Sequence, residues 1–254
     1  MFPNTIYVGP LSLPTYATLL SLGVIGAVLL SVWQGHRRGL APTRPFDAAL
    51  LGASGGLLGA RATYVIVNWA FYRDHLAEAL RLSAGGLAWQ GGLLFGLLLI
   101  TLYGLRFRLS LGVLLDTVAL GLAWFTLCLW LGSGAANDVY GRETFPSDDV
   151  LWRLSADLPD VYGLRAPRIN VPLLGMVWSG LVFPILWCLG ERMRKPGGLF
   201  CIYLALTGLG GLALIPLQAN AVPYLFHLRL DWLFMLVLTA VGVCGLLAVK
   251  LRAA

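Results

Sequence analysis

The sequence has few charged residues. Only 12% of its 254 residues are charged, against about 25% in an ordinary soluble domain, while 58% are hydrophobic and the mean hydropathy is +0.79. Apolar runs of roughly twenty residues recur along the chain, and each is long enough to cross a bilayer core of about 30 Å. The composition therefore excludes secreted, fibrous and disordered classes and predicts an integral membrane protein.

The sequence also lacks the residue patterns of metal sites and disulfide frameworks. Its four cysteines lie inside apolar runs without ligand spacing, and its three histidines are far apart in the chain. We therefore expect reduced cysteines, no metal ion and no cofactor. The net charge of +6 does not indicate a nucleic-acid partner, because the lysines and arginines lie mostly in short connectors between apolar runs.

Seven membrane-spanning helices are predicted from the apolar runs. They cover residues 12–34, 46–70, 87–105, 110–131, 171–190, 198–217 and 232–250. Basic residues concentrate in the connectors after the first, third and fifth spans and in the C-terminal tail, so the positive-inside rule places these segments in the cytoplasm. The predicted fold is an all-α membrane protein with an external N-terminus and a cytoplasmic C-terminus, and residues 1–254 form a single domain.

One long segment, residues 132–170, lies outside the predicted spans. It contains glycines, prolines and several carboxylates, and we expect a small arm on the extracytoplasmic side. Residues 155–158 could begin a short amphipathic helix, although an ordinary structured loop suits so brief a pattern better. The mixed charges and apolar residues of the segment, Trp152 among them, predict a contact surface for a membrane-protein partner. The alternative is a loop packed on its own bundle.

Two ionisable residues, Arg61 and Asp116, fall within predicted spans. A charge at mid-span costs about 2.5–3.5 kcal/mol on insertion scales, so each side chain must face the bundle interior or reach an interface. Arg61 lies roughly midway between Arg44 and Arg73, which belong to the two connectors that flank its span. It can bind an anion such as a lipid phosphate, or it can pair with a carboxylate or with backbone carbonyls, and the sequence leaves both open.

Several motifs recur in the order and at the spacing of one known family. The second span carries Gly59-Ala60-Arg61 followed by Tyr64-Val65, which is the most specific piece. The other pieces are Val8-Gly9-Pro10 with Tyr16, Gly91-Gly92, Asp116, Tyr140-Gly141-Arg142 with Thr144, and Lys195-Pro196-Gly197 with Tyr203. Together they resemble the prolipoprotein diacylglyceryl transferases of the bacterial inner membrane, over most of the chain.

This resemblance implies a reaction and a set of functional residues. Members of the family move a diacylglyceryl group from phosphatidylglycerol to the cysteine thiol of a lipoprotein, which needs a cationic phosphate pocket and a proton acceptor. The resemblance implies a phospholipid partner, lipid binding at five positions and three catalytic candidates if the chain is active. The lipid-binding positions are Tyr16, Arg61, Tyr64, Asp116 and Arg142, and the catalytic candidates are Gln90, Asp138 and Arg142.

The chain departs from the family at several functional positions. Gln90 stands where the family has a histidine, and an amide is not a useful proton acceptor near neutral pH. Trp130 and Gly211 stand where the family has arginines, and Ser133 where it has an asparagine. Residues 166–172 keep only the first proline of a family segment that otherwise contains histidine, tyrosine and glutamate.

These losses set two hypotheses against each other. Removing one charge-stabilising donor from a catalytic site costs about 10²–10³ in rate, and several cations that would meet one phosphate are absent. The first hypothesis is a catalytically lapsed relative that acts as an accessory or lipid-binding subunit of a membrane assembly. The alternative is a divergent transferase that still works on phosphatidylglycerol or a related lipid. A transporter is less favoured, because no span carries the paired ionisable residues or broken half-helices of transporters.

Overall fold

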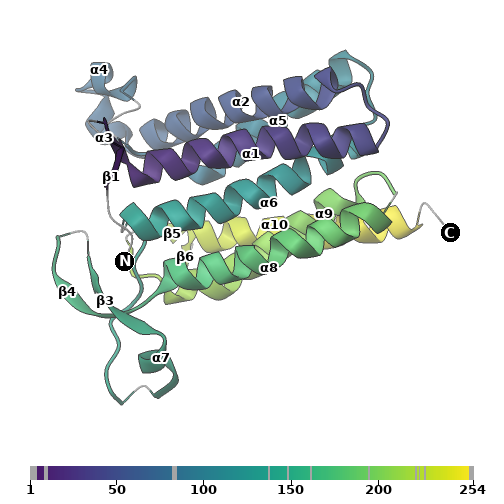
Figure 1. Ribbon diagram of the computed structural model, residues 1–254. Helices are drawn as coiled ribbons and strands as arrows, with labels where there is room; N and C mark the ends of the chain where they lie inside the picture. Colours follow the sequence, from purple (N-terminus) through teal and green to yellow (C-terminus); the bar gives the residue numbers. More distant parts are fainter. Residues whose placement is uncertain are drawn as a thin grey trace. The chain divides into compact units, whose positions relative to one another are not determined.

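The computed structural model is built mainly from long helices (Figure 1). It describes residues 5–8, 11–81, 85–136, 138–147, 149–160, 162–193, 195–220, 222, 224–225 and 227–251. Within these ranges six helical segments are long and apolar enough to cross a membrane. They are α1 (Thr15–Arg37), α2 (Thr43–Val67), α6 (Leu111–Ala136), α8 (Val171–Arg192), α9 (Gly198–Leu214) with the 3-10 turn η2 (Ile215–Leu217), and α10 (Leu230–Leu251). The prediction of a multi-pass membrane protein is confirmed.

The third predicted span, residues 87–105, corresponds to helix α5 (Trp89–Arg106), which is 18 residues long. It is not among the six membrane-crossing helices, because Gln90 and Arg106 occupy its two ends and lower its hydropathy. The structure thus supports six crossing helices by length and composition, and a seventh crossing stays a prediction.

The chain is mostly helical, as predicted, and short β-hairpins accompany the helices. Strands β1 (Thr5–Val8) and β2 (Leu11–Pro14) pair antiparallel before α1, and β5 (Tyr224–Leu225) and β6 (Leu228–Arg229) pair before α10. Strands β3 (Ser155–Pro159) and β4 (Arg165–Ile169) form the third hairpin. Neither a helix nor a loop therefore begins at Ser155. The remaining short helices are α3 (Trp69–Tyr72), α4 (Leu76–Ala79) and α7 (Asp149–Arg153).

The helices belong to two compact units, residues 28–118 and residues 1–27 with 119–254. In residues 28–118, helices α2 and α5 pack closely because glycines line both surfaces. A Cβ added at Gly59 would collide with Phe95, and one added at Gly96 would lie 2.8 Å from the carbonyl oxygen of Gly52. In lipid, such small residues allow close van der Waals packing of helix backbones.

In the second unit, residues 1–27 with 119–254, helices α9 and α10 also pack through glycines. A Cβ added at Gly242 would lie 2.7 Å from the carbonyl oxygen of Cys201, and one added at Gly208 would lie 2.7 Å from the backbone nitrogen of Thr239. The indole of Trp178 on α8 donates to the carbonyl of Leu206 on α9 at 3.0 Å. Close packing and a cross-helix hydrogen bond therefore fix the three helices.

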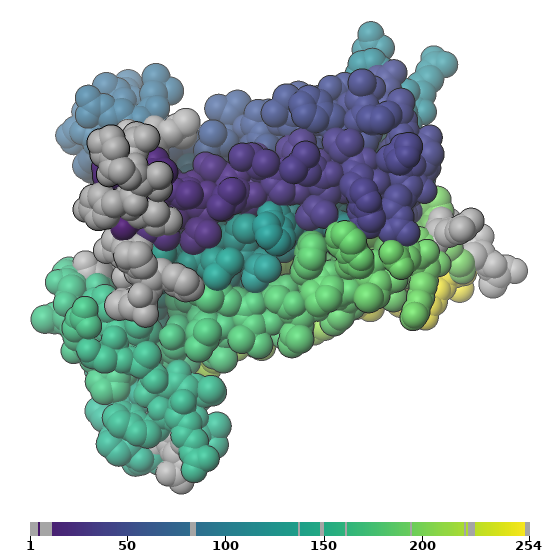
Figure 2. Space-filling view, in the orientation of Figure 1, coloured from purple at the N-terminus to yellow at the C-terminus, as the bar shows by residue number. Residues whose placement is uncertain are grey.

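The arm of the second unit, with β3, β4 and α7, extends beyond the ends of α6 and α8 (Figure 1), and it projects from the rest of that unit in the space-filling view (Figure 2). The segment from Tyr140 to Thr144 makes backbone hydrogen bonds to two other parts of the unit. The Arg142 N–H donates to the Leu217 carbonyl, and the Arg142 carbonyl accepts from the Ile169 N–H. Beneath the hairpin a small apolar core of Ile169, Val171 and Leu214 anchors the arm to the helices. Asn170 caps α8, its side chain accepting from the Leu173 N–H at 3.1 Å.

Candidate functional site

Arg61 is held by backbone carbonyls. It lies six residues before the end of α2, about 9 Å from that end along the axis, and its residue is only 5% exposed. Its Nε donates to the carbonyl of Ala79 and its Nη2 to that of Glu78, while Nη1 donates to those of Gly85 and Gly86. All three guanidinium nitrogens are therefore engaged, and the cation stabilises the connector between α2 and α5.

Two aromatic rings flank the same guanidinium. Its Cζ lies 5.4 Å from the ring centroid of Tyr72 and 5.9 Å from that of Tyr64, and the two rings meet edge to face. Gly85 and Gly86 both have a positive φ, and a Cβ at Gly86 would collide with the Tyr64 ring. The glycines therefore allow the backbone to turn its carbonyls toward Arg61 beside the aromatic rings.

Within residues 28–118 the structure brings Gln90 near Arg61 but places Asp116 elsewhere. Gln90 lies in the first turn of α5, where the Ala88 N–H donates to the Ala60 carbonyl at 3.0 Å. The fully buried Asp116 instead accepts from Arg38 at 2.7 Å. Arg38 precedes α2, whereas Arg61 lies 18 residues into it, about 27 Å along the axis. Asp116 thus neutralises a different arginine.

In the other unit, Tyr16 and Asp138 flank the end of α6. The Tyr16 ring packs on Gly132, where an added Cβ would lie 3.0 Å from Cδ2. Asp138 follows the helix and accepts a hydrogen bond from the buried Ser133 hydroxyl. Desolvation raises the pKa of the Asp138 carboxyl above its ordinary value, although hydrogen bonds from Ser133 and from the backbone N–H of Val139 act in the opposite direction. The fold therefore raises the proton affinity of the Asp138 carboxyl.

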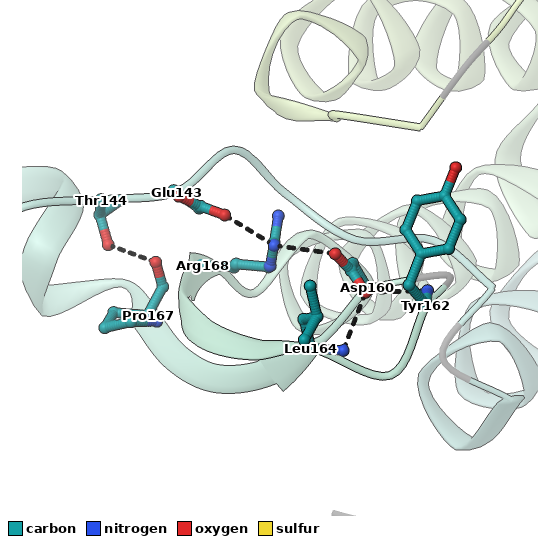
Figure 3. A network of polar contacts seen from close by, with 7 residues as sticks. All are labelled: Glu143, Thr144, Asp160, Tyr162, Leu164, Pro167 and Arg168. Atoms are coloured by element: carbon teal, nitrogen blue, oxygen red, sulfur yellow. Dashed lines mark hydrogen bonds and ion pairs between the residues drawn. The ribbon is translucent and has the colours of Figure 1, made fainter.

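Arg142 and Arg168 both lie in the arm, but they differ in exposure and in their partners. Arg142 is exposed, and no hydrogen bond or ion pair to its guanidinium is found among the residues that the structure describes. Arg168 is 6% exposed and its Nη2 lies 2.7 Å from Glu143 Oε1 and 3.4 Å from Asp160 Oδ2 (Figure 3). Its Cζ also lies 5.3 Å from the ring centroid of Tyr140. Arg142 is therefore available to an anion, and Arg168 serves the arm itself.

Apolar packing occupies two positions where the resembled family has arginines. The Trp130 indole packs against Gly175 and joins the apolar core of Ile169, Val171 and Leu214. At Gly211 an added Cβ would collide with the Met235 side chain. The Trp130 indole and the Met235 side chain therefore occupy these two places with apolar atoms.

Sequence reasoning missed the hairpin that holds Arg168. Its signal is the segment Pro159-Asp160 followed by Gly163, because proline, aspartate and glycine favour turns. The Asp160 carboxylate accepts from the N–H groups of Tyr162 and Leu164, and Gly163 has a φ of +81°. Val161 and Asp148, both in the predicted partner surface, lie outside the described residues. Across the described ranges, no group of three metal-ligating side chains is found.

The long apolar helices define the class of this protein, which is a multi-pass membrane protein. A family model described as prolipoprotein diacylglyceryl transferase matches residues 3–248. The chain therefore belongs to the prolipoprotein diacylglyceryl transferase family, and it is a multi-pass protein of the bacterial inner membrane. The resemblance seen in the motifs is confirmed.

Similar curated proteins carry the name phosphatidylglycerol–prolipoprotein diacylglyceryl transferase. The one from Streptococcus agalactiae serotype Ia is 27% identical over 243 residues, which cover 95% of this chain and 93% of the relative. The one from Lactiplantibacillus plantarum is 29% identical over 216 residues, covering 82% and 75%. The one from Thermosynechococcus vestitus is 27% identical over 252 residues, covering 95% and 90%.

Proposed function

We propose that this protein is a catalytically lapsed member of its family that binds phospholipid and serves as an accessory subunit of a membrane assembly. In this proposal the chain is a single membrane domain with seven spans, an external N-terminus and a cytoplasmic C-terminus. Phosphatidylglycerol is the lipid of choice, and Arg142 is the cation that meets its phosphate beside Tyr16 and Asp138. Arg61, Tyr64 and Asp116, the other residues of the predicted lipid-binding set, contribute indirectly in this proposal, by holding their own helices and connector in place.

The observation that carries this proposal is the apolar packing at Trp130 and Gly211. Transfer of a diacylglyceryl group requires cations around the leaving phosphate, and electrostatic stabilisation of that kind is usually the largest single contribution to catalysis. Here an indole and the Met235 side chain fill those places. Gln90 is a further loss, because an amide stands where the family has a histidine that can accept a proton. A lipid can still bind at such a surface, but the reaction lacks its charge stabilisation.

One observation favours the alternative, an active transferase. The raised pKa of Asp138 gives the arm a carboxylate that is a better proton acceptor than an ordinary aspartate, and Arg142 lies four residues further along the same segment. In that alternative Asp138 accepts the thiol proton and Arg142 stabilises the phosphate, while Gln90 remains the third candidate that the family resemblance implies.

A transfer assay separates the two functions. The purified protein in phosphatidylglycerol nanodiscs is incubated with a lipobox peptide, and mass spectrometry follows the peptide thiol. The Streptococcus agalactiae relative is the positive control. We expect no diacylglyceryl adduct above the peptide-only background. An adduct that accumulates over several turnovers and is lost in both Asp138→Asn and Arg142→Gln would establish the active enzyme instead.

Cysteine labelling tests the proposed topology. The four native cysteines are free in the structure and are first replaced by alanine or serine. Single cysteines are then placed at Met193, in the predicted cytoplasmic connector, and at Ser147, in the predicted external arm. A membrane-impermeant maleimide should label position 147 in intact cells and position 193 only after permeabilisation. The reverse pattern would invert the topology.

The arm supplies the proposed partner surface. Tyr162 and Leu164 are 86% and 66% exposed at the tip of the β3–β4 hairpin, and the Tyr162 ring points away from the Arg168 network (Figure 3). We expect purification in mild detergent to recover a stoichiometric membrane partner, and Tyr162→Ser with Leu164→Ser to weaken its retention. Leu209→Ala, in the membrane-crossing helix α9, is the control and should leave retention unchanged. Recovery as a lone monomer from native nanodiscs would contradict the accessory role.

A further inference from the structure

A basic cleft of about 450 Å³ lies at the ends of α8 and α10, in the unit that also carries the arm. Its lining combines three cations with three apolar side chains, and none of the described lining residues is acidic. The cations are Arg192, Lys195 and Lys250, and the apolar residues are Met193, Leu246 and Val249. The volume falls within the range of small-molecule sites.

The cleft is formed by segments that are far apart in the sequence. Arg192 ends α8, and Lys250 lies in the last turn of α10. Lys195 begins the Lys-Pro-Gly turn between α8 and α9, where the Gly198 N–H donates to the Lys195 carbonyl and Gly197 has a φ of +86°. This turn is one of the family motifs to which the proposed function assigns no role. Its geometry brings Lys195 back toward the end of α8.

The lining has a cationic part and an apolar part, so it suits a phospholipid better than a soluble anion. Met193, Leu246 and Val249 are only partly buried, so they offer an apolar wall to a glycerol backbone or the start of an acyl chain. The three cations are exposed, and no ion pair engages them within the described part of the chain. Because α8 and α10 are long enough to cross a membrane, their ends lie at the level of lipid headgroups.

From this lining we infer that the cleft binds the phosphate headgroup of an anionic phospholipid, at the membrane surface opposite the arm. The site is separate from Arg142 and does not depend on whether the chain transfers diacylglycerol. Each cation near an anionic surface contributes about fivefold in affinity, so three cations give a preference of about a hundredfold over a zwitterionic lipid. The apolar wall selects the lipid over free phosphate.

Photo-crosslinking tests the site directly. The full-length protein in mild detergent is mixed with phosphatidylglycerol that carries a photoreactive group near its glycerol, and cross-linked peptides are identified by mass spectrometry. We expect cross-links in the peptides that contain Met193 and Leu246, and displacement by unlabelled phosphatidylglycerol at concentrations about a hundredfold below those of phosphatidylcholine. Glycerol 3-phosphate should not displace the lipid. Equal displacement by phosphatidylcholine or by glycerol 3-phosphate would overturn the proposal.

Two variants separate binding from folding. Combined Arg192→Gln, Lys195→Gln and Lys250→Gln should abolish the preference for the anionic lipid, and Leu246→Trp should fill the cleft and reduce cross-linking without removing charge. Arg153→Gln with Arg165→Gln, which removes two exposed cations of the arm, is the matched control and should change nothing. Wild-type cross-linking at these peptides in both cleft variants would contradict the inference, as would an unchanged lipid preference in the triple variant. Arg142→Gln should leave this cleft intact, which distinguishes it from the proposed lipid contact of the arm.

Discussion

Two arginines, Arg61 and Arg168, are buried to almost the same extent in different units of this protein. They are 5% and 6% exposed, yet the fold satisfies them by different means. Arg61 donates from all three nitrogens to four backbone carbonyls, whereas Arg168 uses Nη2 for two carboxylates. Within the described residues the buried Nε of Arg168 finds no partner.

The difference shows what each arginine stabilises. Carbonyl oxygens belong to the main chain, so the Arg61 guanidinium fixes the path of the connector between α2 and α5. If the guanidinium is removed, that path is no longer fixed. Arg168 instead joins side chains, one of which, Glu143, is half exposed and can reach water. When the ion pair breaks, water can hydrate an exposed carboxylate such as that of Glu143, and this hydration reduces the loss of stability. We therefore expect the two arginines to differ in stability effect and in which part of the chain responds.

The largest expected effect is that of Arg61→Ala. The change leaves four backbone carbonyls without their cation, and such a loss in a buried site costs about 3–5 kcal/mol. Hydrogen exchange should rise throughout residues 76–88, and the melting temperature in detergent should fall. Arg73→Ala, whose side chain is 63% exposed beside Asp74, is the control and should cost less than about 1 kcal/mol. Unchanged protection of residues 76–88 in Arg61→Ala would break the comparison.

Arg168→Gln should have the second-largest effect and lower the free energy of unfolding by about 2–3 kcal/mol. It removes the cation that pairs with the Asp160 carboxylate, and it disturbs the arm rather than the helices. Limited proteolysis should cleave the arm faster while the helical circular dichroism persists. The matched control is Arg165→Gln, since Arg165 pairs with Asp157 at 3.4 Å and both side chains are more than 60% exposed. If Arg165→Gln destabilised the arm as much as Arg168→Gln, burial would not explain the difference.

Gly86→Ala sharpens the account of the Arg61 connector. Both Gly86 and Gly85 have a positive φ, which costs an alanine roughly 1 kcal/mol, but only at Gly86 would the added Cβ collide with Tyr64. We expect the free energy of unfolding to fall by about 2 kcal/mol in Gly86→Ala and by about 1 kcal/mol in Gly85→Ala. Thermal unfolding in the same detergent measures both. Equal losses would mean that the Tyr64 ring moves aside freely.

The smallest effect concerns Asp138 and depends on pH. Because desolvation raises its folded pKa, the native state loses stability as the pH rises from the ordinary aspartate value through the raised one. Asp138→Asn removes that loss and should stabilise the protein at neutral pH by about 0.5 kcal/mol, with no gain below the unfolded pKa. Ser133→Ala removes a donor to the carboxylate and should act in the opposite direction. A gain that is equal at pH 3 and pH 7 would exclude the titration of Asp138 as its cause.

The sequence was sufficient to predict the membrane helices, because an apolar run of about twenty residues has few alternatives to a helix in lipid. Six predicted spans correspond to helices that meet the length and composition of a crossing helix, with ends shifted by a few residues. The β-hairpins were not predicted. Strand β3 contains only five residues, Ser155–Pro159, and its pairing with Arg165–Ile169 depends on a turn whose signal is short.

The candidate site was predictable as a set of residues but not as an arrangement. The motifs alone supplied Arg61 and the family to which the chain belongs, since residue order and spacing are properties of the sequence. Whether Arg61 faces an anion or a backbone carbonyl depends on where residues 78–79 and 85–86 lie, and only the tertiary structure decided this in favour of carbonyls. In the same way the family resemblance implied that Trp130 stands where relatives have an arginine. The packed structure showed that its indole packs against an apolar core, which the sequence could not show because close packing depends on residues brought together from distant segments.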